Sequence, residues 1–498
     1  MRYLPNGAWM QKADAYTIHE IGVPSVVLME HAAESMVNIL EEENVDCSKT
    51  LIVCGSGNNG GDGFAVARLL AQKGKSVVTV FVGKETSMSE ECCLQCQIVK
   101  NMGIPVVANI PEEEYSLIID AVFGVGLCRE ISGHYAKVIQ KMNAMAGTKA
   151  AVDIPSGVCS ATGKVLGIAF EADLTVTFQC EKIGCALFPG RNYAGNVFVA
   201  DIGIDTQIFA DKKEIPYTLE VLDLKERLPK RSADTHKGSY GKVLMITGSK
   251  GMAGAAYLSA KAAYTCGAGL VQIYTDEVNR SVLQGLLPEA IISVYQEYDE
   301  VSLKNMLGWA DVVCIGCGLG QTETSRKLLE GTLKNCQVPC VIDADGLNML
   351  ANQKELLSEC ACDVILTPHM KEMSGLVSCS ISKIAEHRFE VLEQFVEEFP
   401  VICALKDART AVAQNGRSIF LNTAGNHAMA KAGSGDVLAG TITGMLAGHL
   451  DAFDAAVTGV LLHACGGDEA RAELGSYSVL AQDLISGIQR CLKKVEDK

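Results

Sequence analysis

The chain has 498 residues, of which 48% are hydrophobic and 20% charged, and its formal net charge is −16. This length is too great for a single hydrophobic core, so we expect two domains. The acidic balance argues against nucleic acid as the main partner, although a local basic pocket for phosphates is compatible with it.

No targeting or membrane-spanning segment is predicted. Residues 1–16 contain no apolar stretch followed by a cleavage site. The longest apolar run, after Val437, is interrupted by His449, Asp451 and Asp454. We therefore expect a cytoplasmic protein with no membrane partner.

The 20 cysteines do not suggest a secreted disulfide scaffold, because the chain is long and carries no export signal. Two C-x-x-C pairs, Cys93/Cys96 and Cys314/Cys317, lie too far apart in the sequence to suggest one zinc ribbon. Cys314 ends an apolar run, where a reduced thiol packs as a small hydrophobic group. We expect structural thiols in a reducing compartment.

In the first half of the chain, glycine-bounded apolar runs alternate with helical patterns. They predict strands at TLIVCGSG, SVVTVFVG, SLIIDAVFG, KAAVDIPSG and ADLTVTF. Uninterrupted apolar runs are typical of parallel strands covered on both faces. The helices between them indicate a Rossmann-like, doubly wound βαβ domain, which we place at residues 1–210.

A charged, irregular stretch at residues 211–227 predicts a linker. Residues 228–498 then begin a second α/β domain with a mostly parallel sheet. Its strands are expected at KVLMITGS, DVVCIGCG, PCVIDADG, DVILTPH and VICALKD. No motif of the first domain aligns with the second, so the chain is interpreted as a fusion and not a duplication.

Gly55–Gly60 match the dinucleotide fingerprint G-x-G-x-x-G. Two asparagines and Asp62 nevertheless crowd the turn where a redox enzyme places the cofactor pyrophosphate. Glu85 stands roughly where a ribose-binding acid belongs, so an NAD-dependent dehydrogenase is one alternative. Another is that these residues only cap a helix beginning near Phe64. Capping explains one or two of them, not the whole run.

Polar residues follow several predicted strands of the first domain. The first strand is followed by residues 58–62, a later one ends in Asp120, and another supplies Asp153 and Ser156. In open α/β sheets, ligands bind at these carboxyl ends. Such a set could coordinate a hard monovalent cation through oxygen, or hydrogen-bond a ribose and a polar ring.

In the second domain, Gly433-Ser434-Gly435-Asp436 precedes a strongly helical stretch. Backbone N–H groups at a glycine-rich helix start form an anion hole for a transferring phosphoryl group. Asp436 beside it can accept a proton from an attacking hydroxyl. The structural alternative is a capped, buried helix, but Gly-Ser-Gly is a poor helix start for packing alone.

Other strand ends of the second domain agree with a phosphate site. Lys406, Arg409 and Thr410 follow one strand and suit nucleotide phosphates. His369 and Glu372 follow another, although a lone histidine is more often structural. Gly318 and Gly320 follow a further strand, and flexible backbone is expected around Gly254 and Ala255. No Walker A sequence is present, so the domain is not a P-loop NTPase.

Two known domain types resemble these motifs. GVPSVVLMEHAA, NNGGDG, FGVGLCR, VDIPSG and FPGRNYAGNVFVADIGI together resemble the NAD(P)H-hydrate epimerase domain, over nearly all of the first domain. HKGSYGKVLMITGS, GCGLG, TPHMKEM and GNHAMAKAGSGDVLAG resemble the ribokinase-like, ADP-dependent NAD(P)H-hydrate dehydratase domain from about Leu228 onward. Two positions depart from that second pattern: Asp407 replaces a frequent glycine and Gly375 a frequent arginine.

The first resemblance implies that the glycine-rich segment holds a damaged cofactor as substrate. NADH and NADPH can add water across a ring double bond, giving R and S hydrates (NADHX and NADPHX), which the epimerase interconverts. Potassium would be held by Asn59, Asp120 and Ser156, and Asp153 is the acid/base candidate. The hydrate would contact Asn58, Asn59, Gly60, Gly61, Asp62, Gly124, Val125, Gly126, Leu127, Cys128, Arg129, Glu130 and Asp153.

The second resemblance implies that the S hydrate is phosphorylated and then eliminates phosphate. Asp436 would deprotonate the hydroxyl, ADP would be the donor with ATP possible, and Glu372 would orient Mg²⁺ through water. The anion hole would comprise Gly433, Ser434 and Gly435. The hydrate would contact Ala255, Gly318, His369 and Asp436, and the nucleotide would contact Lys406, Asp407, Ala408, Arg409, Thr410 and Gly435.

Together these resemblances predict a bifunctional repair enzyme acting on small molecules, NADHX, NADPHX and ADP, and expected to form a homo-oligomer. A dehydratase selective for the S hydrate would strand the R form, and a fused epimerase removes that problem. The products would be NAD(P)H, AMP and phosphate. Two alternatives stay open: the second domain could be a kinase for a sugar or vitamin precursor, and the first a non-catalytic binding module.

Overall fold

A computed structural model describes residues 1–497 of the chain and divides into two units, Arg2–Pro216 and the chain from Tyr217 onward. The division falls inside the stretch 211–227. Residues after Pro216 fold with the second unit: β9 (Tyr217–Thr218) pairs with β18 (Phe420–Leu421), and Leu224 in α8 (Leu224–Arg227) is fully buried. That part of the charged stretch is therefore ordered structure.

The N-terminal unit contains a seven-stranded parallel sheet in the order β4-β3-β2-β5-β6-β7-β8. The chain runs outward from β2 to β4 and then returns to the other side of β2, which is the doubly wound arrangement expected from the sequence. The strands are β2 (Lys49–Cys54), β3 (Ser76–Phe81), β4 (Val106–Val107), β5 (Leu117–Ala121), β6 (Thr148–Val152), β7 (Leu174–Phe178) and β8 (Asn196–Ala200).

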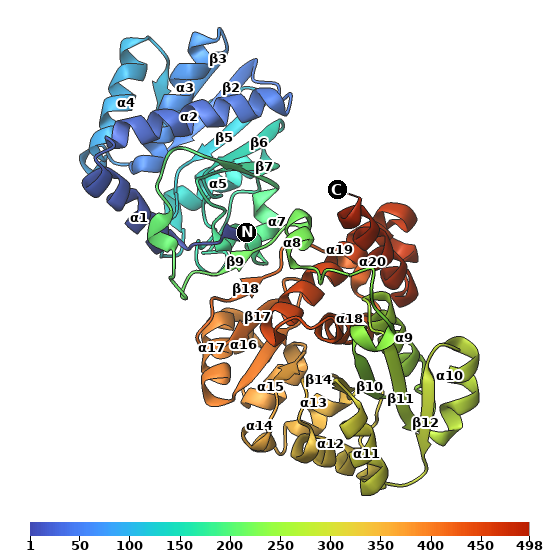
Figure 1. The fold of residues 1–498 in the computed structure, drawn as a ribbon. Coiled ribbons are helices and arrows are strands. Elements are labelled where there is room, and N and C mark those ends of the chain that lie inside the picture. Colours follow the sequence, from blue (N-terminus) through green and yellow to red (C-terminus); the bar gives the residue numbers. More distant parts are fainter. Residues whose placement is uncertain (498) are drawn as a thin grey trace. The chain divides into compact units, whose positions relative to one another are not determined.

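Helices cover both faces of this sheet (Figure 1). Alternate residues of β2 face opposite ways, because strand side chains have a period of two. Ile52 packs with α2 (Ser25–Glu42), α3 (Asn58–Gln72) and α4 (Glu90–Asn101), whereas Leu51 packs with α5 (Gly133–Ala144). The remaining elements of the unit are β1 (Arg2–Tyr3), α1 (Gly7–Tyr16), α6 (Ile183–Ala186) and α7 (Gly190–Ala194).

The glycine-rich segment is largely helical, which corrects the expectation of a helix beginning near Phe64. Helix α3 begins at Asn58, with Gly57 as its N-cap. A Cβ atom at Gly60 would lie 2.0 Å from the carbonyl oxygen of Gly55, and one at Gly63 would lie 2.5 Å from Cβ of Ala121. The glycines thus let the first turns of α3 pack directly against the backbone and against β5.

The sheet of the second unit runs β9-β18-β17-β16-β15-β14-β13-β10-β11-β12. Strands β10 to β16 are parallel, and β17 and β18 are antiparallel additions. Strands β11, β12, β17 and β18 were not predicted; β11 and β12 carry partly exposed residues instead of uninterrupted apolar runs. The bounds are β10 (Lys242–Ile246), β11 (Leu270–Asp276), β12 (Ile291–Tyr295), β13 (Val312–Ile315), β14 (Cys340–Ile342), β15 (Val364–Leu366), β16 (Val401–Leu405) and β17 (Ala411–Gln414).

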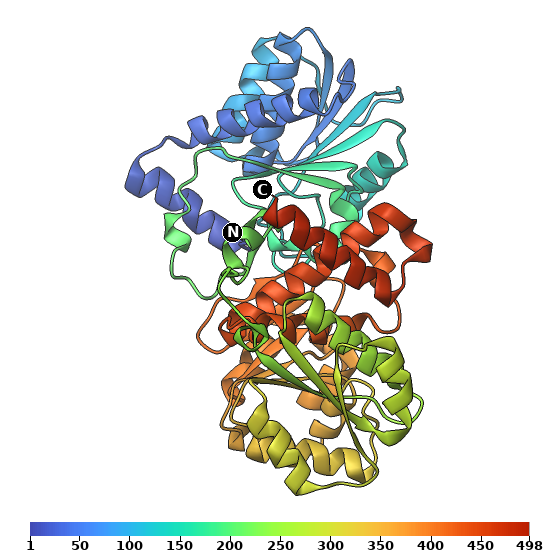
Figure 2. The ribbon, with the colours of Figure 1, turned by 45° about the vertical axis from the view of Figure 1, so that its right-hand side comes forward.

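Four helices share one apolar core against a face of this sheet, and Figure 2 shows the red C-terminal helices beside the green α9. They are α9 (Ala253–Thr265), α18 (Ser434–Ala447), α19 (Ala452–Ser478) and α20 (Ala481–Glu496). The other helices are α10 (Arg280–Leu286), α11 (Glu300–Trp309), α12 (Glu323–Asn335), α13 (Asp345–Leu350), α14 (Leu356–Glu359), α15 (Met370–Val377), α16 (Ile381–Glu386) and α17 (Arg388–Glu398).

Two further features bear on the sequence predictions. Across residues 1–497, no helix combines the length and the apolar character that a membrane crossing requires. All 20 cysteines are free thiols, and most of them are buried.

Candidate active sites in the two units

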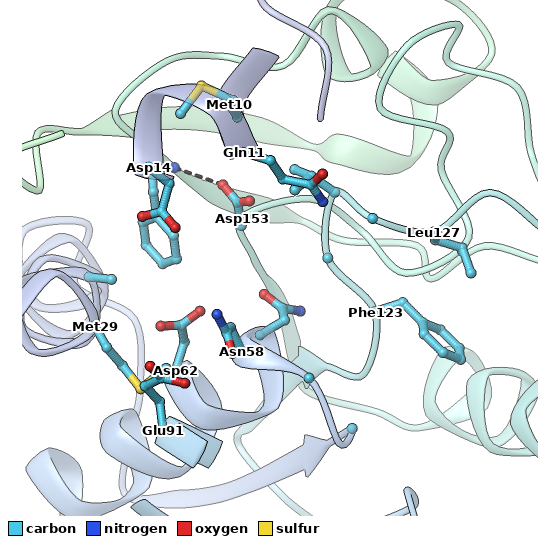
Figure 3. A pocket seen from close by; sticks show the side chains of 18 of the residues that line it. Met10, Gln11, Asp14, Met29, Asn58, Asp62, Glu91, Phe123, Leu127 and Asp153 are labelled. Atoms are coloured by element: carbon cyan, nitrogen blue, oxygen red, sulfur yellow. Dashed lines mark hydrogen bonds between the residues drawn. The ribbon is translucent and has the colours of Figure 1, made fainter. Parts of the chain in front are cut away.

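A cavity of ≈ 540 Å³ opens at the carboxyl ends of β2, β5 and β6 in the N-terminal unit. Figure 3 shows its side chains converging from α1, α3, α4 and the strand ends. Strand order reverses between β2 and β5, and this is where open α/β sheets bind ligands. The fold therefore places the cavity where a substrate is expected.

Most of the predicted hydrate-binding residues line this cavity. Gly60 and Gly61 do not line it: a Cβ at Gly61 would lie 2.7 Å from Cε of Met29, so this glycine serves helix packing. Glu130 is exposed outside the lining. The residues found in the lining are Asn58, Asn59, Asp62, Gly124, Val125, Gly126, Leu127, Cys128, Arg129 and Asp153.

Asp153 is held in an unusual conformation by a buried lysine. Its φ is 66°, in the left-handed region that non-glycine residues seldom adopt and that concentrates at functional sites. Lys182, whose side chain is 1% exposed, donates to Oδ1 of Asp153, and the backbone N–H of Phe178 donates to the same oxygen at 2.9 Å. These donors converge on Oδ1 and leave Oδ2 for a ligand.

Three further carboxyl groups line the same cavity (Figure 3). Burial, reinforced by Asp153 and Asp14, raises the pKa of Asp62 well above its usual range. Burial, with the charge of Glu91, also raises the pKa of Asp14. Both shifts favour the neutral acid, which can donate a hydrogen bond to a bound ligand.

Sequence reasoning missed Asp14, Glu91 and Lys182. Asp14 lies on α1 and Glu91 on α4, and neither stands at a strand end, so no pattern marked them. Lys182 follows β7 in the run FQCEKIG, so the strand-end rule could have found it.

Two of the three residues expected to hold potassium, Asp120 and Ser156, are buried, and the third, Asn59, lines the cavity. Ser156 donates from N to Oδ2 and from Oγ to Oδ1 of Asp120, each at 2.7 Å. Asp120 is 0% exposed. Burial raises the pKa of its carboxyl group to about 6, although the hydrogen bonds from Ser156 act to lower it. Among residues 1–497 this carboxylate has no cationic partner. Asn59 is half-buried, and its amide nitrogen, which is itself buried, lacks a hydrogen-bond partner.

A monovalent cation fits that set. Oxygen ligands suit a hard cation. A buried carboxylate without a positive neighbour is stabilised by one.

In the C-terminal unit, α18 begins at Ser434, and Gly433 precedes it with φ +89°. A Cβ atom added at Gly435 would lie 3.4 Å from Nζ of Lys406 and 3.6 Å from Oδ2 of Asp343. The N-terminus of α18, which carries Asp436, is thus brought together with Lys406 and Asp343. Such an N-terminus provides backbone donors and a favourable dipole for a phosphate.

Asp436 lies in a cluster with Cys317 and Asp343, whose side-chain ligand atoms all lie within 4.8 Å of one another. Burial, and then the charge of Asp343, raises the pKa of Asp436 to about 6. Nζ of Lys406 donates to Oδ1 of Asp343 at 2.5 Å. Lys406 already neutralises Asp343, and a thiol is a poor ligand for magnesium, so this cluster does not fit a Mg²⁺ site.

Asp343 was also missed by sequence reasoning, although it stands at the strand end VIDADG. His463 is a second omission. It is 8% exposed, its Nε2 lies 3.4 Å from Oγ of Ser434, and burial lowers its pKa to about 4. No sequence pattern marked His463, because it lies in the middle of α19 and not at a strand end or helix start.

His369 and Glu372 form a capping box at the start of α15. The backbone N–H of His369 donates to Oε2 of Glu372 at 2.8 Å, and the N–H of Glu372 donates to Nδ1 of His369 at 3.0 Å. Oε1 of Glu372 is the atom that could accept from a magnesium-bound water. The Glu372 carboxyl lies near Lys406, so it faces the same site.

The remaining predicted residues form two groups. A Cβ at Gly318 would lie 2.7 Å from Cβ of Ala255, so these two positions are neighbours. In the segment 406–410, Arg388 pairs with Asp407 and donates to the carbonyl of Arg409 at 3.0 Å. Asp407, which stands where the dehydratase pattern frequently has glycine, is therefore neutralised by Arg388.

Comparisons with known proteins agree with this geometry. Residues 243–490 match the NAD(P)H-hydrate dehydratase family, and residues 25–184 match the family described as YjeF-related protein N-terminus. The bifunctional NAD(P)H-hydrate repair enzyme of Moorella thermoacetica is 35% identical, over 100% of this chain and 98% of its own. The chain belongs to the family of bifunctional NAD(P)H-hydrate repair enzymes.

Solved structures establish the fold of the repair enzyme's second unit. The ADP/ATP-dependent NAD(P)H-hydrate dehydratase of Bacillus subtilis is 29% identical, with a TM-score of 0.51 over 56% of this chain and 98% of its own. A ribokinase-like superfamily protein of Enterococcus faecalis is 28% identical, with a TM-score of 0.50 over 56% of this chain and 95% of its own. The ribokinase-like prediction and both domain resemblances are thus confirmed.

Proposed function

We propose that the chain repairs hydrated NADH and NADPH in two reactions, epimerisation in the N-terminal unit and nucleotide-dependent dehydration in the C-terminal unit. The observation that carries the proposal is that this member of the family has two carboxylate sites of different construction, one in each unit. Asp153 lines a cavity of ≈ 540 Å³, and Asp436 stands in the first turn of α18, whose glycine-rich N-terminus suits a phosphate.

Epimerisation needs little chemistry. The ring nitrogen of the hydrate expels the hydroxyl from the adjacent carbon, and water returns to the other face of the ring. Oδ2 of Asp153 accepts the proton that the adding water releases, while Lys182 holds Oδ1, and transfer of this proton to Asp62 through solvent restores both groups. The neutral acid of Asp62 is placed to protonate the departing hydroxyl.

Potassium is proposed to be held by Asn59, Asp120 and Ser156. When bound, it would supply a fixed positive charge at the carboxyl ends of β5 and β6. The chain's own contribution is positional, because the 2.7 Å hydrogen bonds between Ser156 and Asp120 tie the end of β5 to the segment after β6. Phe123 donates its N–H to Oγ of Ser156 at 2.8 Å, which extends this tie to the loop at Gly124–Glu130.

In the C-terminal unit, the S hydrate is proposed to contact Ala255, Gly318, His369 and Asp436. Asp436 accepts the proton of the ring hydroxyl as this oxygen attacks the terminal phosphorus of the nucleotide. Backbone N–H groups at Gly433, Ser434 and Gly435 stabilise the transferring phosphoryl group. The bond between the terminal phosphorus and the bridging oxygen of the nucleotide breaks, so ADP yields AMP as the leaving group and a phosphate ester of the hydrate.

Elimination then completes the repair. Phosphate is a far better leaving group than hydroxide, and the lone pair of the ring nitrogen expels it. Loss of a proton from the next ring carbon restores the double bond and so the reduced cofactor. The balance is one hydrate and one ADP consumed, and one NAD(P)H, one AMP and one inorganic phosphate formed.

The nucleotide is proposed to contact Gly435 and the segment Lys406, Asp407, Ala408, Arg409 and Thr410. Lys406 and the N-terminus of α18 supply positive potential, and Arg388 offsets the charge of Asp407. ADP is the proposed donor, with ATP as an alternative; the Bacillus subtilis dehydratase was co-crystallised with ATP and Mg²⁺. Glu372 would hold Mg²⁺ through water, and the ion would supply neutralisation of the phosphate charge.

The experiment is the return of reduced-nicotinamide absorbance from a mixed R/S hydrate sample, with ADP or ATP added. Full conversion, faster than spontaneous epimerisation, supports both activities, and the better nucleotide is the donor. Conversion that stops after the S form contradicts the epimerase role. No conversion with either nucleotide contradicts the dehydratase role and favours a small-molecule kinase.

A further inference from the structure

One side of the N-terminal cavity is acidic. Asp14 from α1, Asp62 from α3 and Glu91 from α4 all line it. Figure 3 shows these three side chains on one side of the cavity, and Phe123 and Leu127 on the opposite side. Three helices thus deliver one carboxyl group each to the same face of the cavity, and we call Asp14, Asp62 and Glu91 the acidic wall.

The cationic side chains of the lining are those of Lys182 and Arg129, and neither pairs with the acidic wall. Lys182 is hydrogen-bonded to Asp153 and to the carbonyl of Phe178. Arg129 is exposed and belongs to the loop that follows Leu127. Within residues 1–497, no lysine, arginine or histidine forms an ion pair with a member of the wall. The wall therefore presents unneutralised carboxyl groups to a ligand.

The carboxyl group of Glu91 is held in a fixed orientation. Ser25, the first residue of α2, donates from Oγ to Oε1 of Glu91 at 2.6 Å, so Oε2 can face a ligand. After burial, the charge of Glu91 is the next cause of the raised pKa of Asp14. Crowded carboxyl groups without cationic partners are costly in the empty cavity. A positive charge on a bound ligand would offset that cost.

The distribution of charge orients the nicotinamide hydrate. Its diphosphate is anionic and is repelled by the acidic wall. The opposite side, with Arg129 and the N-terminus of α3 at Asn58, suits that diphosphate better. The wall is then left for the nicotinamide ring, which is uncharged in the hydrate.

The ring does not stay uncharged during epimerisation. The bond between carbon and the hydroxyl oxygen breaks, the oxygen keeps both electrons, and Asp62 protonates it to water. The lone pair of the ring nitrogen forms a double bond to the same carbon, so the ring becomes positively charged as Asp62 becomes negative. Return of water to the other face reverses these changes. Fixed negative groups that face the ring lower the barrier, because they need no reorganisation when the charge develops.

We propose that Asp14 and Glu91 stabilise the cationic ring formed when the hydroxyl leaves, and that the acidic wall makes this cavity selective for a positively charged nicotinamide ring. The inference rests on the proposed epimerase function and assigns a role to two residues outside its motifs. It has a consequence for binding. NAD⁺, whose ring carries a permanent positive charge, should bind this cavity more tightly than NADH, whose ring is neutral.

The first test is equilibrium binding of NAD⁺ and of NADH to the full-length chain with Trp309→Phe. Trp9 fluorescence then reports on the N-terminal cavity, because Trp9 precedes the lining residue Met10 on α1. NAD⁺ should bind about tenfold more tightly than NADH, as expected for attraction between partly screened charges. Glu91→Gln should weaken NAD⁺ binding by about tenfold and leave NADH binding unchanged. Glutamine keeps an oxygen for Ser25 to donate to, so only the charge is lost.

The second test is the rate of R-hydrate consumption, coupled to an excess of the Asp153→Asn chain, which dehydrates the S form. Glu91→Gln and Asp14→Asn should each lower kcat for epimerisation by about 10- to 100-fold, with KM changed by less than about twofold. KM is spared because the ring of the bound hydrate is neutral. Glu90→Gln is the matched control: this neighbouring residue of α4 is exposed and outside the lining, so neither binding nor turnover should change.

The outcomes separate this inference from the function on which it rests. A parent chain that fails to epimerise contradicts the proposed function. Equal affinity of the parent for NAD⁺ and NADH overturns the selectivity of the acidic wall, whatever the activity. If the parent epimerises and Glu91→Gln raises KM with kcat unchanged, or weakens NAD⁺ and NADH equally, Glu91 only shapes the cavity and the inference is wrong.

Discussion

The ammonium group of Lys182 donates to the same carboxylate oxygen of Asp153 that accepts the backbone N–H of Phe178. Lys182 also donates to the carbonyl of Phe178 at 2.7 Å, so one lysine joins the end of β7 to the residue after β6. The lysine side chain is 1% exposed, so this ion pair lies inside the unit and away from solvent. The pair thus positions Asp153 and at the same time makes the N-terminal unit sensitive to loss of either residue.

Removing the lysine should therefore cost stability as well as activity. Lys182→Met leaves a buried carboxylate unpaired, and we expect a loss of roughly 3–5 kcal/mol in unfolding free energy. The Lys182→Met/Asp153→Asn double variant should recover much of that loss while staying inactive in epimerisation. Urea unfolding followed by Trp9 fluorescence in a Trp309→Phe background reports on the N-terminal unit, since the chain has 2 tryptophans. Equal stability of Lys182→Met and its parent would contradict the role of the pair.

Asp153→Asn alone should separate the two activities. Asparagine tolerates the left-handed φ of 66°, so the backbone should not change. The proton transfer is lost, and we expect epimerisation to fall by about 10²–10⁴-fold. In the mixed-hydrate assay the S form should be consumed normally and the R form should persist beyond the spontaneous rate. Rapid consumption of both forms would remove Asp153 from the mechanism.

Dehydration should depend on the ionisation of Asp436. Because its pKa is raised to about 6, the base is ionised above that pH and protonated below it. The rate with pure S hydrate and ADP should therefore fall about tenfold per pH unit below 6 and level off above it. Samples returned from acid to neutral pH should regain full activity, which separates titration from unfolding. Asp436→Asn should slow dehydration by about 10²–10⁴-fold and leave epimerisation intact.

Two glycines of the same segment should respond oppositely to alanine. At Gly60 an added Cβ would lie 2.0 Å from the Gly55 oxygen, whereas at Gly57 nothing lies within 4 Å. Gly60→Ala should lower the unfolding free energy of the N-terminal unit by about 1–3 kcal/mol through overpacking. Gly57→Ala should change it by less than about 0.5 kcal/mol. Similar losses at both positions would show that the close approach at Gly60 is unimportant.

Potassium should stabilise the N-terminal unit. Replacing choline with saturating K⁺ should raise its thermal midpoint by roughly 2–6 °C. Asn59→Ala should remove this response without loss of stability in choline, because the amide nitrogen of Asn59 has no hydrogen-bond partner to lose. Asn58→Ala, at the neighbouring position in the cavity lining, should keep the response. A potassium response that survives in Asn59→Ala would place the ion elsewhere.

The sequence alone determined the fold class, both domain types, the strand ends that carry Asp120 and Asp153, and the glycine-rich helix start that carries Asp436. It did so because buried parallel strands need uninterrupted apolar runs, and because the carboxyl ends of those strands share one edge of the sheet. Only the tertiary structure brought Asp14 and Glu91 into the first cavity, paired Lys182 with Asp153, and set Asp343 and His463 beside the start of α18. These relationships depend on how helices and strands distant in the sequence pack together, and local patterns of residues do not encode such contacts.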